Sequence, residues 1–174
     1  MVAGNEGVKQ TFEAYIQALY FNRVLGFANE RMRVMTGNRF VLQISEPEEG
    51  GHGKIGLDID VLDTFTGKTR AANTLSGGES FKAALSLALG LSDAVQSMNG
   101  GIHIDTLFVD EGFGSLDTES INQALSVLHD LSDGRILIGI ISHVSALKNE
   151  IDRKIEVSHV DDGLKGSRAE IIID

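Results

Sequence analysis

The chain has 174 residues, no cysteine and a formal net charge of −10 at neutral pH. The length suits one domain that buries roughly 70% of its unfolded surface, and no apolar run approaches the ~20 residues of a membrane span. The lack of cysteine excludes disulfides and thiolate metal sites, and the acidic balance disfavours a surface that coats nucleic acid. Because residues 1–7 hold no apolar signal core, we expect a cytoplasmic protein without membrane contact.

The first third of the chain predicts a long helix followed by a hairpin. Apolar residues recur at three- and four-residue spacing over 8–36, which predicts one helix of about 40 Å. This helix is long for the chain, and we interpret it as the inner end of a longer arm. Residues 39–45 and 55–62 are then predicted as strands of an antiparallel hairpin, joined by a turn at 46–51 that holds proline, glycines and acids.

The remainder predicts alternating helices and strands. A helix over 79–98 is apolar around nearly its full circumference, which predicts burial on all sides. A continuous apolar strand at 104–109 is typical of a parallel sheet covered on both faces. The further predicted elements are helix 118–131, strand 136–141, a short helix near 145–151, and strands 153–159 and 167–173 around a turn at Asp161-Asp162-Gly163. The predicted fold class is therefore α/β with a parallel sheet and additional hairpins.

The segment Leu75-Ser76-Gly77-Gly78-Glu79-Ser80 precedes the second long helix and permits two interpretations. Ser76 and Glu79 have the spacing of a capping box, in which each side chain accepts a backbone N–H at a helix start. Gly77 and Gly78 leave first-turn amides uncovered, so a phosphate could approach the positive end of the helix. The two interpretations are compatible, and these residues alone leave both open.

Two adjacent carboxylates, Asp110 and Glu111, follow the strand predicted at 104–109. In P-loop NTPases an acid at this place holds Mg²⁺. The next acid can serve as general base toward the attacking water. The alternative is a buried strand that runs into a polar turn.

Two further polar segments follow these carboxylates. Gly112-Phe113-Gly114-Ser115-Leu116-Asp117 opens helix 118–131, where Asp117 has the ordinary alternative of an N-cap. Ser142 and His143 come directly after strand 136–141, at a strand end where α/β proteins build their sites. No set of His, Asp and Glu has the spacing of metal ligands.

Taken in order, these motifs resemble the C-terminal half of an ABC-type ATPase, a P-loop NTPase, over roughly residues 70–145. Within that superfamily, segments 75–81 and 110–117 are most similar to the SbcC family, bacterial DNA-repair ATPases that work with the nuclease SbcD. Transporter ATPases usually carry Gln where this chain has Glu79, and SMC and RecN proteins usually differ in the turn after the Asp-Glu pair. In SbcC a coiled coil separates the two halves of the ATPase, which fits the helix over 8–36.

The resemblance implies a role for each motif residue. Asp110 would support Mg²⁺, Glu111 would polarise the attacking water, and His143 would contact the γ-phosphate. A second group would contact ATP held by an opposite head or reach across the same dimer interface. This group comprises Ser76, Gly77, Gly78, Glu79, Ser115 and Asp117.

The phosphate loop G-x-x-x-x-G-K-[ST] of an NTPase is missing from this sequence. Gly67-Lys68-Thr69 has the right ending, but Leu62 stands at the first position, and Gly53-Lys54 fails at both ends. We therefore expect residues 1–36 to end a coiled-coil arm and residues 37–174 to form the C-terminal lobe of a head. The N-terminal lobe with the Walker A loop would lie elsewhere, so this chain alone should not hydrolyse ATP.

The resemblance also implies that ATP and Mg²⁺ bind between two heads and control a nuclease at DNA ends. The implied partners are the N-terminal lobe, a second copy of the head, an SbcD-like nuclease and DNA, although the net charge of −10 gives DNA binding no support. One alternative is an SMC- or RecN-like head, and another is a non-catalytic docking module. An incomplete sheet would expose an edge or an apolar face, so we expect oligomers or dependence on a partner.

Overall fold

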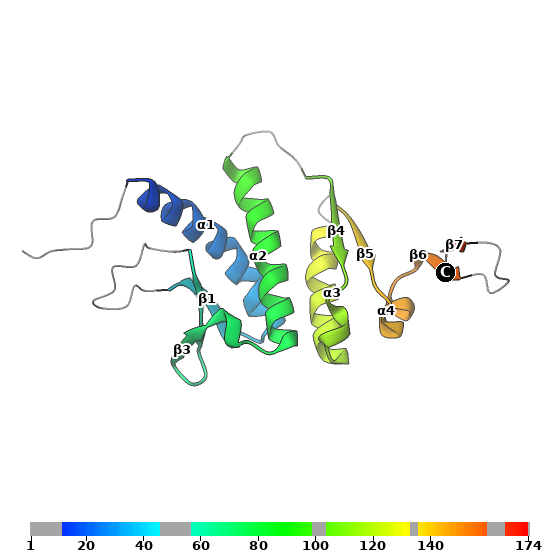
Figure 1. Ribbon diagram of the computed structural model, residues 1–174, viewed down its shortest axis with the longest axis horizontal. Helices are drawn as coiled ribbons and strands as arrows, with labels where there is room; N and C mark the ends of the chain where they lie inside the picture. The colour runs from blue at the N-terminus through cyan, green and yellow to red at the C-terminus, as the bar shows by residue number, and fades with distance from the viewer. Residues whose placement is uncertain (1–11, 46–56, 99–103, 133–135, 160–165, 174) are drawn as a thin grey trace, which may run out of the picture.

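The computed structural model describes residues 12–45, 57–98, 104–132, 136–159 and 166–173. In chain order its elements are α1 (Phe12–Met35), β1 (Phe40–Ile44), β2 (Ile59–Asp63), β3 (Lys68–Ala71), η1 (Ala72–Thr74), α2 (Gly77–Met98), β4 (Thr106–Asp110), η2 (Phe113–Ser115), α3 (Thr118–Ser132), β5 (Leu137–Ile141), α4 (Ser145–Glu150), β6 (Arg153–His159) and β7 (Ser167–Ile173). Figure 1 shows α1 crossing α2 beside a small sheet, with α3 between α2 and the strands β4 and β5. Among the described helices, none has both the length and the apolar character to cross a membrane.

The predicted long helix and antiparallel hairpin are confirmed with shorter bounds. β1 pairs antiparallel with β2, and Phe40 lies opposite Asp63. The helix residues 8–11 and the predicted turn at 46–51 lie outside the described residues. β2 begins at Ile59, so the predicted strand starts too early.

The strand β3 was not predicted. It pairs antiparallel with β2 after a turn in which Gly67 has a φ of +67°. Its sequence, Lys-Thr-Arg-Ala, lacks the apolar alternation of a half-buried strand because it forms a short, charged edge of the sheet. Lys68 and Thr69 therefore belong to a hairpin, in agreement with their rejection as part of a phosphate loop.

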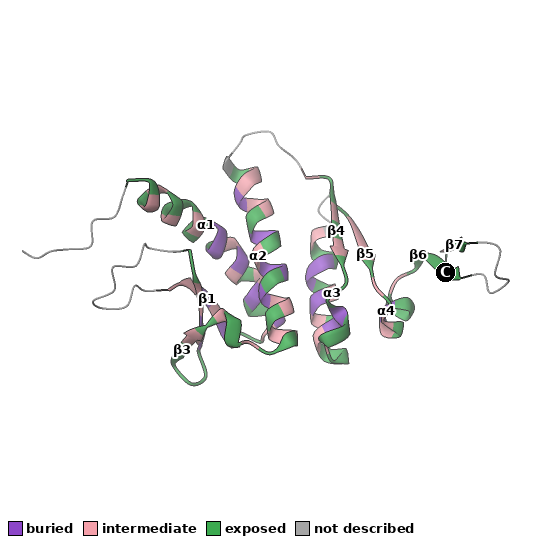
Figure 2. Cartoon of the chain, viewed as in Figure 1, coloured by how far each residue is buried: buried purple, intermediate pink, exposed green. Residues whose placement is uncertain are grey.

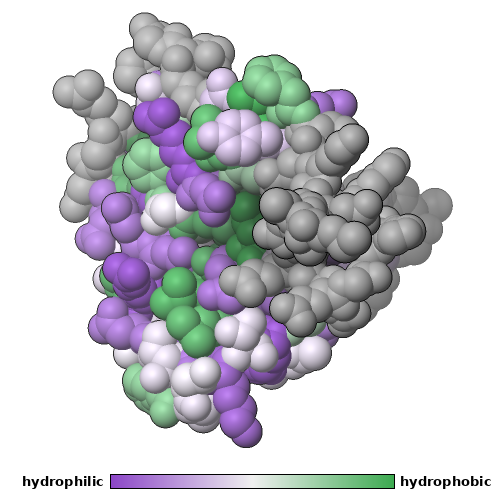
Figure 3. Space-filling view, turned by 90° about the vertical axis from the view of Figure 1, so that its left-hand side faces the viewer, coloured by the Kyte–Doolittle hydropathy of each residue, from purple (hydrophilic) through white to green (hydrophobic). Residues whose placement is uncertain are grey.

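The C-terminal half of α1 packs closely against α2. A Cβ at Gly90 would lie 2.6 Å from the Ala28 nitrogen and 2.7 Å from the Val24 oxygen, so the two backbones meet where Gly90 has no side chain. Arg31 forms an ion pair with Asp93 across the same contact. The other half of α1 exposes large side chains, and Figure 3 shows apolar and aromatic groups on the surface at this end of the molecule. The exposed residues are Phe12, Tyr15, Leu19 and Tyr20.

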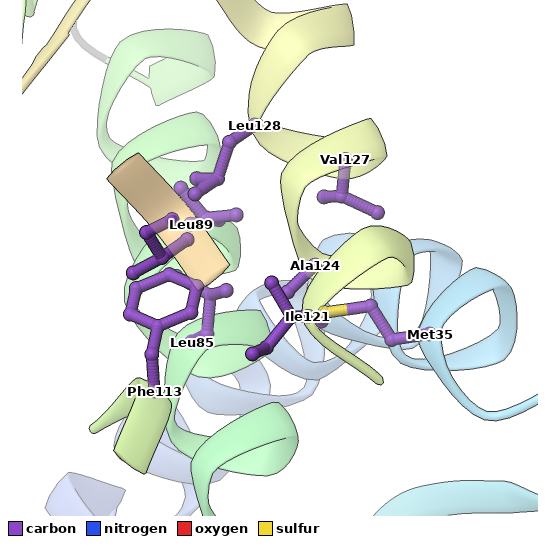
Figure 4. Close-up of a cluster of buried hydrophobic side chains, with 9 residues drawn as sticks. Met35, Leu85, Leu89, Phe113, Ile121, Ala124, Val127 and Leu128 are labelled. Carbon is purple, nitrogen blue, oxygen red and sulfur yellow. The ribbon is translucent and has the colours of Figure 1, made fainter. Parts of the chain in front are cut away.

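Two clusters of buried hydrophobic side chains hold the described elements together. The first joins α1 to β1 and β2 and comprises Leu25, Ala28, Met32, Phe40, Leu42, Val61 and Ala83. The second joins α2, η2 and α3 and comprises Met35, Leu85, Leu89, Phe113, Ile121, Ala124, Val127, Leu128 and Leu147. Figure 4 shows Phe113 beside Leu85 and Leu89, with the side chains of α3 completing this cluster. α2 contributes to both clusters and is therefore the central helix.

Burial of α2 on all sides, as predicted, is wrong. Ala84, Ala88 and Leu91 share one face of the helix, and all three are exposed. Figure 2 shows green exposed turns along α2 between the purple buried ones. The apolar pattern is present on this face, but no described element covers it.

The prediction of a sheet covered on both faces is also wrong for the described residues. β4 and β5 pair in parallel from Thr106 opposite Leu137 to Asp110 opposite Ile141. Leu107, Val109, Ile138 and Ile140 pack against the second cluster. The opposite face exposes Phe108 and Leu137, each 68% accessible, and Ile141 at 54%. Both faces carry the predicted apolar residues, but other described elements cover only one of them.

The C-terminal elements agree with the prediction. β6 and β7 pair antiparallel from Arg153 opposite Ile173 to His159 opposite Ser167. Lys148 of α4 binds Glu156 of β6 at 2.7 Å, which fixes the hairpin to the helix before it. One face of the hairpin exposes apolar side chains, namely Ile155, Val157, Ile171 and Ile173. The predicted turn at 161–163 lies outside the described residues.

Candidate functional site

The capping box at the start of α2 is confirmed. The Ser76 N–H donates to Glu79 Oε2 at 2.9 Å, and the Glu79 N–H donates to Ser76 Oγ at 3.4 Å. α2 begins at Gly77, two residues before its predicted start at 79, so both glycines lie in its first turn. We call Ser76–Glu79 the signature loop from here on.

Arg70 of β3 also binds the signature loop. Its Nη2 donates to Glu79 Oε2 at 3.2 Å, and its Nη1 donates to the Thr74 carbonyl at 2.7 Å. Burial alone would raise the pKa of Glu79, but the hydrogen bonds from Ser76 and the charge and hydrogen bond of Arg70 outweigh burial and lower it. Glu79 is therefore ionised at neutral pH and fixes the loop to the sheet. Sequence reasoning missed Arg70 because it did not predict β3.

Gly77 and Gly78 have a packing role that the sequence did not reveal. A Cβ at Gly77 would lie 3.3 Å from the Ser115 Cβ, and a Cβ at Gly78 would lie 3.3 Å from the Ser115 carbonyl oxygen. The absence of side chains thus lets the first turn of α2 approach the segment 112–117. The Ser115 hydroxyl donates to the Gly112 carbonyl at 3.1 Å, which keeps that segment compact.

The signature loop and the start of α3 line one open cavity of about 830 Å³. Ser76, Gly77 and Gly78 contribute from α2, and Ser115 and Asp117 contribute from the segment before α3. The structure therefore brings all members of the predicted cross-dimer group to one surface, since Glu79 lines the same cavity.

Glu111 and His143 meet at the carboxyl ends of adjacent parallel strands. The Glu111 N–H donates to the Ile141 carbonyl at 2.9 Å and extends the pairing of β4 and β5 by one residue. His143 Nδ1 lies 3.0 Å from Glu111 Oε2 and 3.2 Å from Oε1. Both side chains are open to solvent, at 77% for His143 and 54% for Glu111. The sequence placed both residues at strand ends, where α/β proteins build their sites, but it did not predict their contact.

Asp110 is the last residue of β4, and its side chain is exposed. Within the described part of the chain, no three His, Cys, Asp or Glu side chains gather to hold a metal ion. Mg²⁺ usually takes one or two protein carboxylates and completes its shell with water and phosphate oxygens. A single exposed carboxylate at a strand end fits such an ion.

Asp117 caps α3, as the ordinary interpretation of its position predicted. Its Oδ1 accepts the Ser120 N–H at 2.8 Å. Hydrogen bonds from the Ser120 side chain and the Ser120 N–H lower the pKa of Asp117, and the charge of Lys82 adds to the effect. The cap and a role at an interface are compatible, because Asp117 also lines the cavity below the signature loop.

The segment 112–117 connects the two groups of candidate residues. On one side, a Cβ at Gly114 would lie 3.9 Å from the imidazole of His143. On the other side, Ser115 contacts both signature glycines. One short loop therefore contacts the strand-end pair and the signature loop at once.

Among the families considered for this arrangement, comparison with known proteins supports similarity to SbcC. A family model described as "SbcC/RAD50-like, Walker B motif" matches residues 56–130. The SbcC subunit of nuclease SbcCD from Vibrio cholerae is 48% identical over 154 residues, which cover 88% of this chain and 15% of that protein. The same protein of Staphylococcus saprophyticus is 45% identical over 158 residues, which cover 91% of this chain and 16% of that protein.

The resemblance to SbcC is confirmed. This SbcC-like chain spans only about 15–16% of the length of the curated relatives it matches.

Solved structures confirm the fold class of the SbcC-like chain. A chain from work on "ATP-driven dimerization and DNA stimulated activation of SMC ATPases" superposes with a TM-score of 0.64 at 17% identity, covering 91% of this chain and 88% of that chain. An Smc head bound to the C-winged helix domain of ScpA gives a TM-score of 0.64 at 19% identity, covering 96% and 47% respectively. At this identity the likeness shows the fold alone, which is that of a P-loop ATPase head.

Proposed function

We propose that this SbcC-like chain supplies the C-terminal lobe of an ATPase head that binds and hydrolyses ATP between two heads. The observation that carries this proposal is the contact of Glu111 with His143 at the ends of parallel strands, next to the loop that packs on the signature glycines. α/β proteins bind ligands at this edge of the sheet. A docking module would not need two exposed titratable side chains in contact there.

Glu111 acts on the attacking water. Its half-exposed carboxylate accepts a hydrogen bond from the water and polarises it, a role typically worth about 10²–10⁴-fold in rate. His143 directs Nδ1 toward Glu111, which leaves Nε2 to face the γ-phosphate. One histidine would thus orient the Glu111 carboxylate through Nδ1 and contact the γ-phosphate through Nε2.

Asp110 would hold Mg²⁺ at the end of β4. When bound, the ion would offset negative charge on the phosphates of ATP. Ser76, Gly77 and Gly78 present the positive end of α2 to the γ-phosphate of ATP held by the opposite head. Ser115 and Asp117 lie on the same surface and complete the dimer interface.

In this proposal, the N-terminal lobe with the phosphate loop covers the apolar face and the strand edge of the β4–β5 sheet that the described residues leave exposed. Phe108, Leu137 and Ile141 form an exposed apolar face, and β4 and β5 are the two strands of their sheet. A lobe that adds strands to this sheet would bury that face and pair a free edge. Residues 37–174 then form the C-terminal lobe, and residues 1–36 form the end of a coiled-coil arm.

The complete protein would use ATP to control an SbcD-like nuclease at DNA ends in the cytoplasm. The support is the name of the relatives, which are SbcC subunits of the nuclease SbcCD. In such a dimer each ATP would contact both heads, so its binding energy would be available only in the closed dimer.

The test is to co-express this chain with the phosphate-loop half of the same protein and to measure ATP turnover. Glu111→Gln should lower turnover by about 10²–10⁴-fold while ATP still drives dimerisation. Glu150→Gln, an exposed acid on α4, is the matched control and should leave turnover unchanged. Turnover that survives Glu111→Gln would contradict the proposal, as would turnover by the isolated chain that Glu111→Gln abolishes.

A further inference from the structure

The ring of Phe81 lies directly over the backbone of Gly112. A Cβ built at Gly112 would overlap the Phe81 ring at Cδ2 and Cε2, so the ring occupies the place of a side chain. Phe81 also contacts Phe113, with ring centroids 4.8 Å apart and planes tilted by 57°. An aromatic side chain of α2 therefore closes over the turn that follows β4.

This turn sets the backbone conformation from which the Glu111 side chain projects. Glu111 has a φ of +58° and Gly112 a φ of +93°, so two successive residues adopt the left-handed conformation. For glutamate this conformation is unfavourable and needs support from its surroundings. The Glu111 N–H bond to Ile141 supports the turn from the strand side, and the Phe81 ring supports it from the helix side.

Phe81 also lies close to the signature loop along the same helix. It follows Glu79 by two residues, and the first turn of α2 already rests on Ser115 through its glycines. A helix of this length moves as a rigid body over one or two turns, because its backbone hydrogen bonds are continuous. Any shift of the signature loop along α2 therefore moves the Phe81 ring relative to Gly112.

We propose that Phe81 is a positioning residue that makes the orientation of Glu111 depend on the signature loop of the same head. This inference rests on the proposed function. Nucleotide held by the opposite head would bind the signature loop, and the loop would fix the position of α2. Phe81 would then hold the turn at Glu111 and Gly112, so that the Glu111 carboxylate points toward the attacking water in its own head. Each head thus becomes competent for hydrolysis when the opposite head holds ATP, which is a coupling free energy between the two sites.

The test uses mixed dimers of the full-length protein in which one head, the silent head, carries Glu111→Gln. Only the other head, the active head, can then hydrolyse ATP, with its own Glu111. Phe81→Leu is placed either in the active head or in the silent head. Leucine keeps an apolar helical side chain but has no flat ring to cover Gly112. Leu89→Val, two turns further along α2 in the same buried cluster, is the matched control in each head.

In the active head, Phe81→Leu should lower turnover by about 10- to 100-fold, because small misplacements of a catalytic group cost this much. In the silent head it should change turnover less than about twofold, since that head's signature loop still contacts the hydrolysed ATP. Leu89→Val should have little effect in either place. ATP-driven dimerisation, measured by sedimentation, should be unchanged in all mixed dimers.

A loss from the silent head as large as that from the active head would overturn the inference, because Phe81 would then act on turnover through the signature loop and not only through Glu111 of its own head. No loss from the active head would also overturn it, and so would loss of dimerisation, which would reveal a folding effect. Failure of the proposed function is distinguishable, since dimers with Glu111→Gln in both heads would then still turn over ATP.

Discussion

The α1–α2 end and the β4–β5 end of this molecule contain similar apolar residues but differ in what covers them. At the first end, Gly90 meets the backbone of α1, and Val24, Ala28 and Leu89 beside this contact are buried. At the second end, Phe108 and Leu137 lie on an uncovered face of the sheet. The helix that carries the signature loop is thus supported by described elements, whereas the strands that carry Glu111 and His143 have support on one side. This contrast supports the proposal that a further lobe covers the face of the sheet beside Glu111 and His143.

The largest difference in stability should be between alanine variants of two phenylalanines, one in the buried cluster around α2 and one on the exposed face of β4 and β5. Phe113 is fully buried, so Phe113→Ala should destabilise the chain by about 3–5 kcal/mol. Phe108 is mostly exposed, so Phe108→Ala should cost less than about 1 kcal/mol. Urea denaturation of the 174-residue chain measures both. Similar losses for the two variants would show that the β4–β5 face is covered in solution.

Alanine substitutions at two helical glycines should give the next largest changes in stability. Gly90→Ala places a Cβ against the backbone of α1 and should cost about 1–3 kcal/mol. Gly26 lies within α1 with open space around it, so Gly26→Ala should instead stabilise the chain by about 0.5–1 kcal/mol. Denaturant midpoints would check the opposite signs. A neutral Gly90→Ala would mean that the two helices separate easily.

Self-association should respond to the uncovered face. Replacing Phe108 and Leu137 together by threonine removes two exposed apolar side chains and should shift the isolated chain toward monomer. Sedimentation velocity across concentrations measures the shift, and Glu150→Gln on α4 serves as a surface control. A wild-type chain that is monomeric at all concentrations would contradict this prediction, because the exposed face would then not drive self-association.

The smallest effect concerns pH and the start of α3. The pKa of Asp117 is lowered in the folded chain, so its contribution to stability is complete above the unfolded value of about 3.9 and is lost as pH falls through the folded value. Asp117→Asn keeps a capping oxygen but does not titrate. Between pH 5 and pH 3 the variant should therefore lose less stability than the wild type in thermal melts. Parallel pH curves would show that the cap is not charge-dependent.

Much of this arrangement could be predicted from local patterns. The apolar periodicity predicted the helices, and the apolar strands predicted that Glu111 and His143 follow strand ends, although not that the two side chains meet. β3 could not be predicted because its charged edge residues show no alternation. The cover of Phe108 could not be predicted either, since an apolar pattern shows which residues favour burial and not which element buries them. The roles of Arg70 and Phe81 depend on contacts between distant segments, which no local pattern encodes.

The close contact between Gly90 and α1 has a mechanical consequence. At this contact a glycine with no side chain that could compress or change rotamer meets the backbone of α1, and densely packed interiors transmit strain. A displacement of α1 at this contact would therefore be transmitted to α2. If α1 ends a coiled-coil arm, as proposed, tension along that arm and nucleotide at the signature loop would act on the same helix.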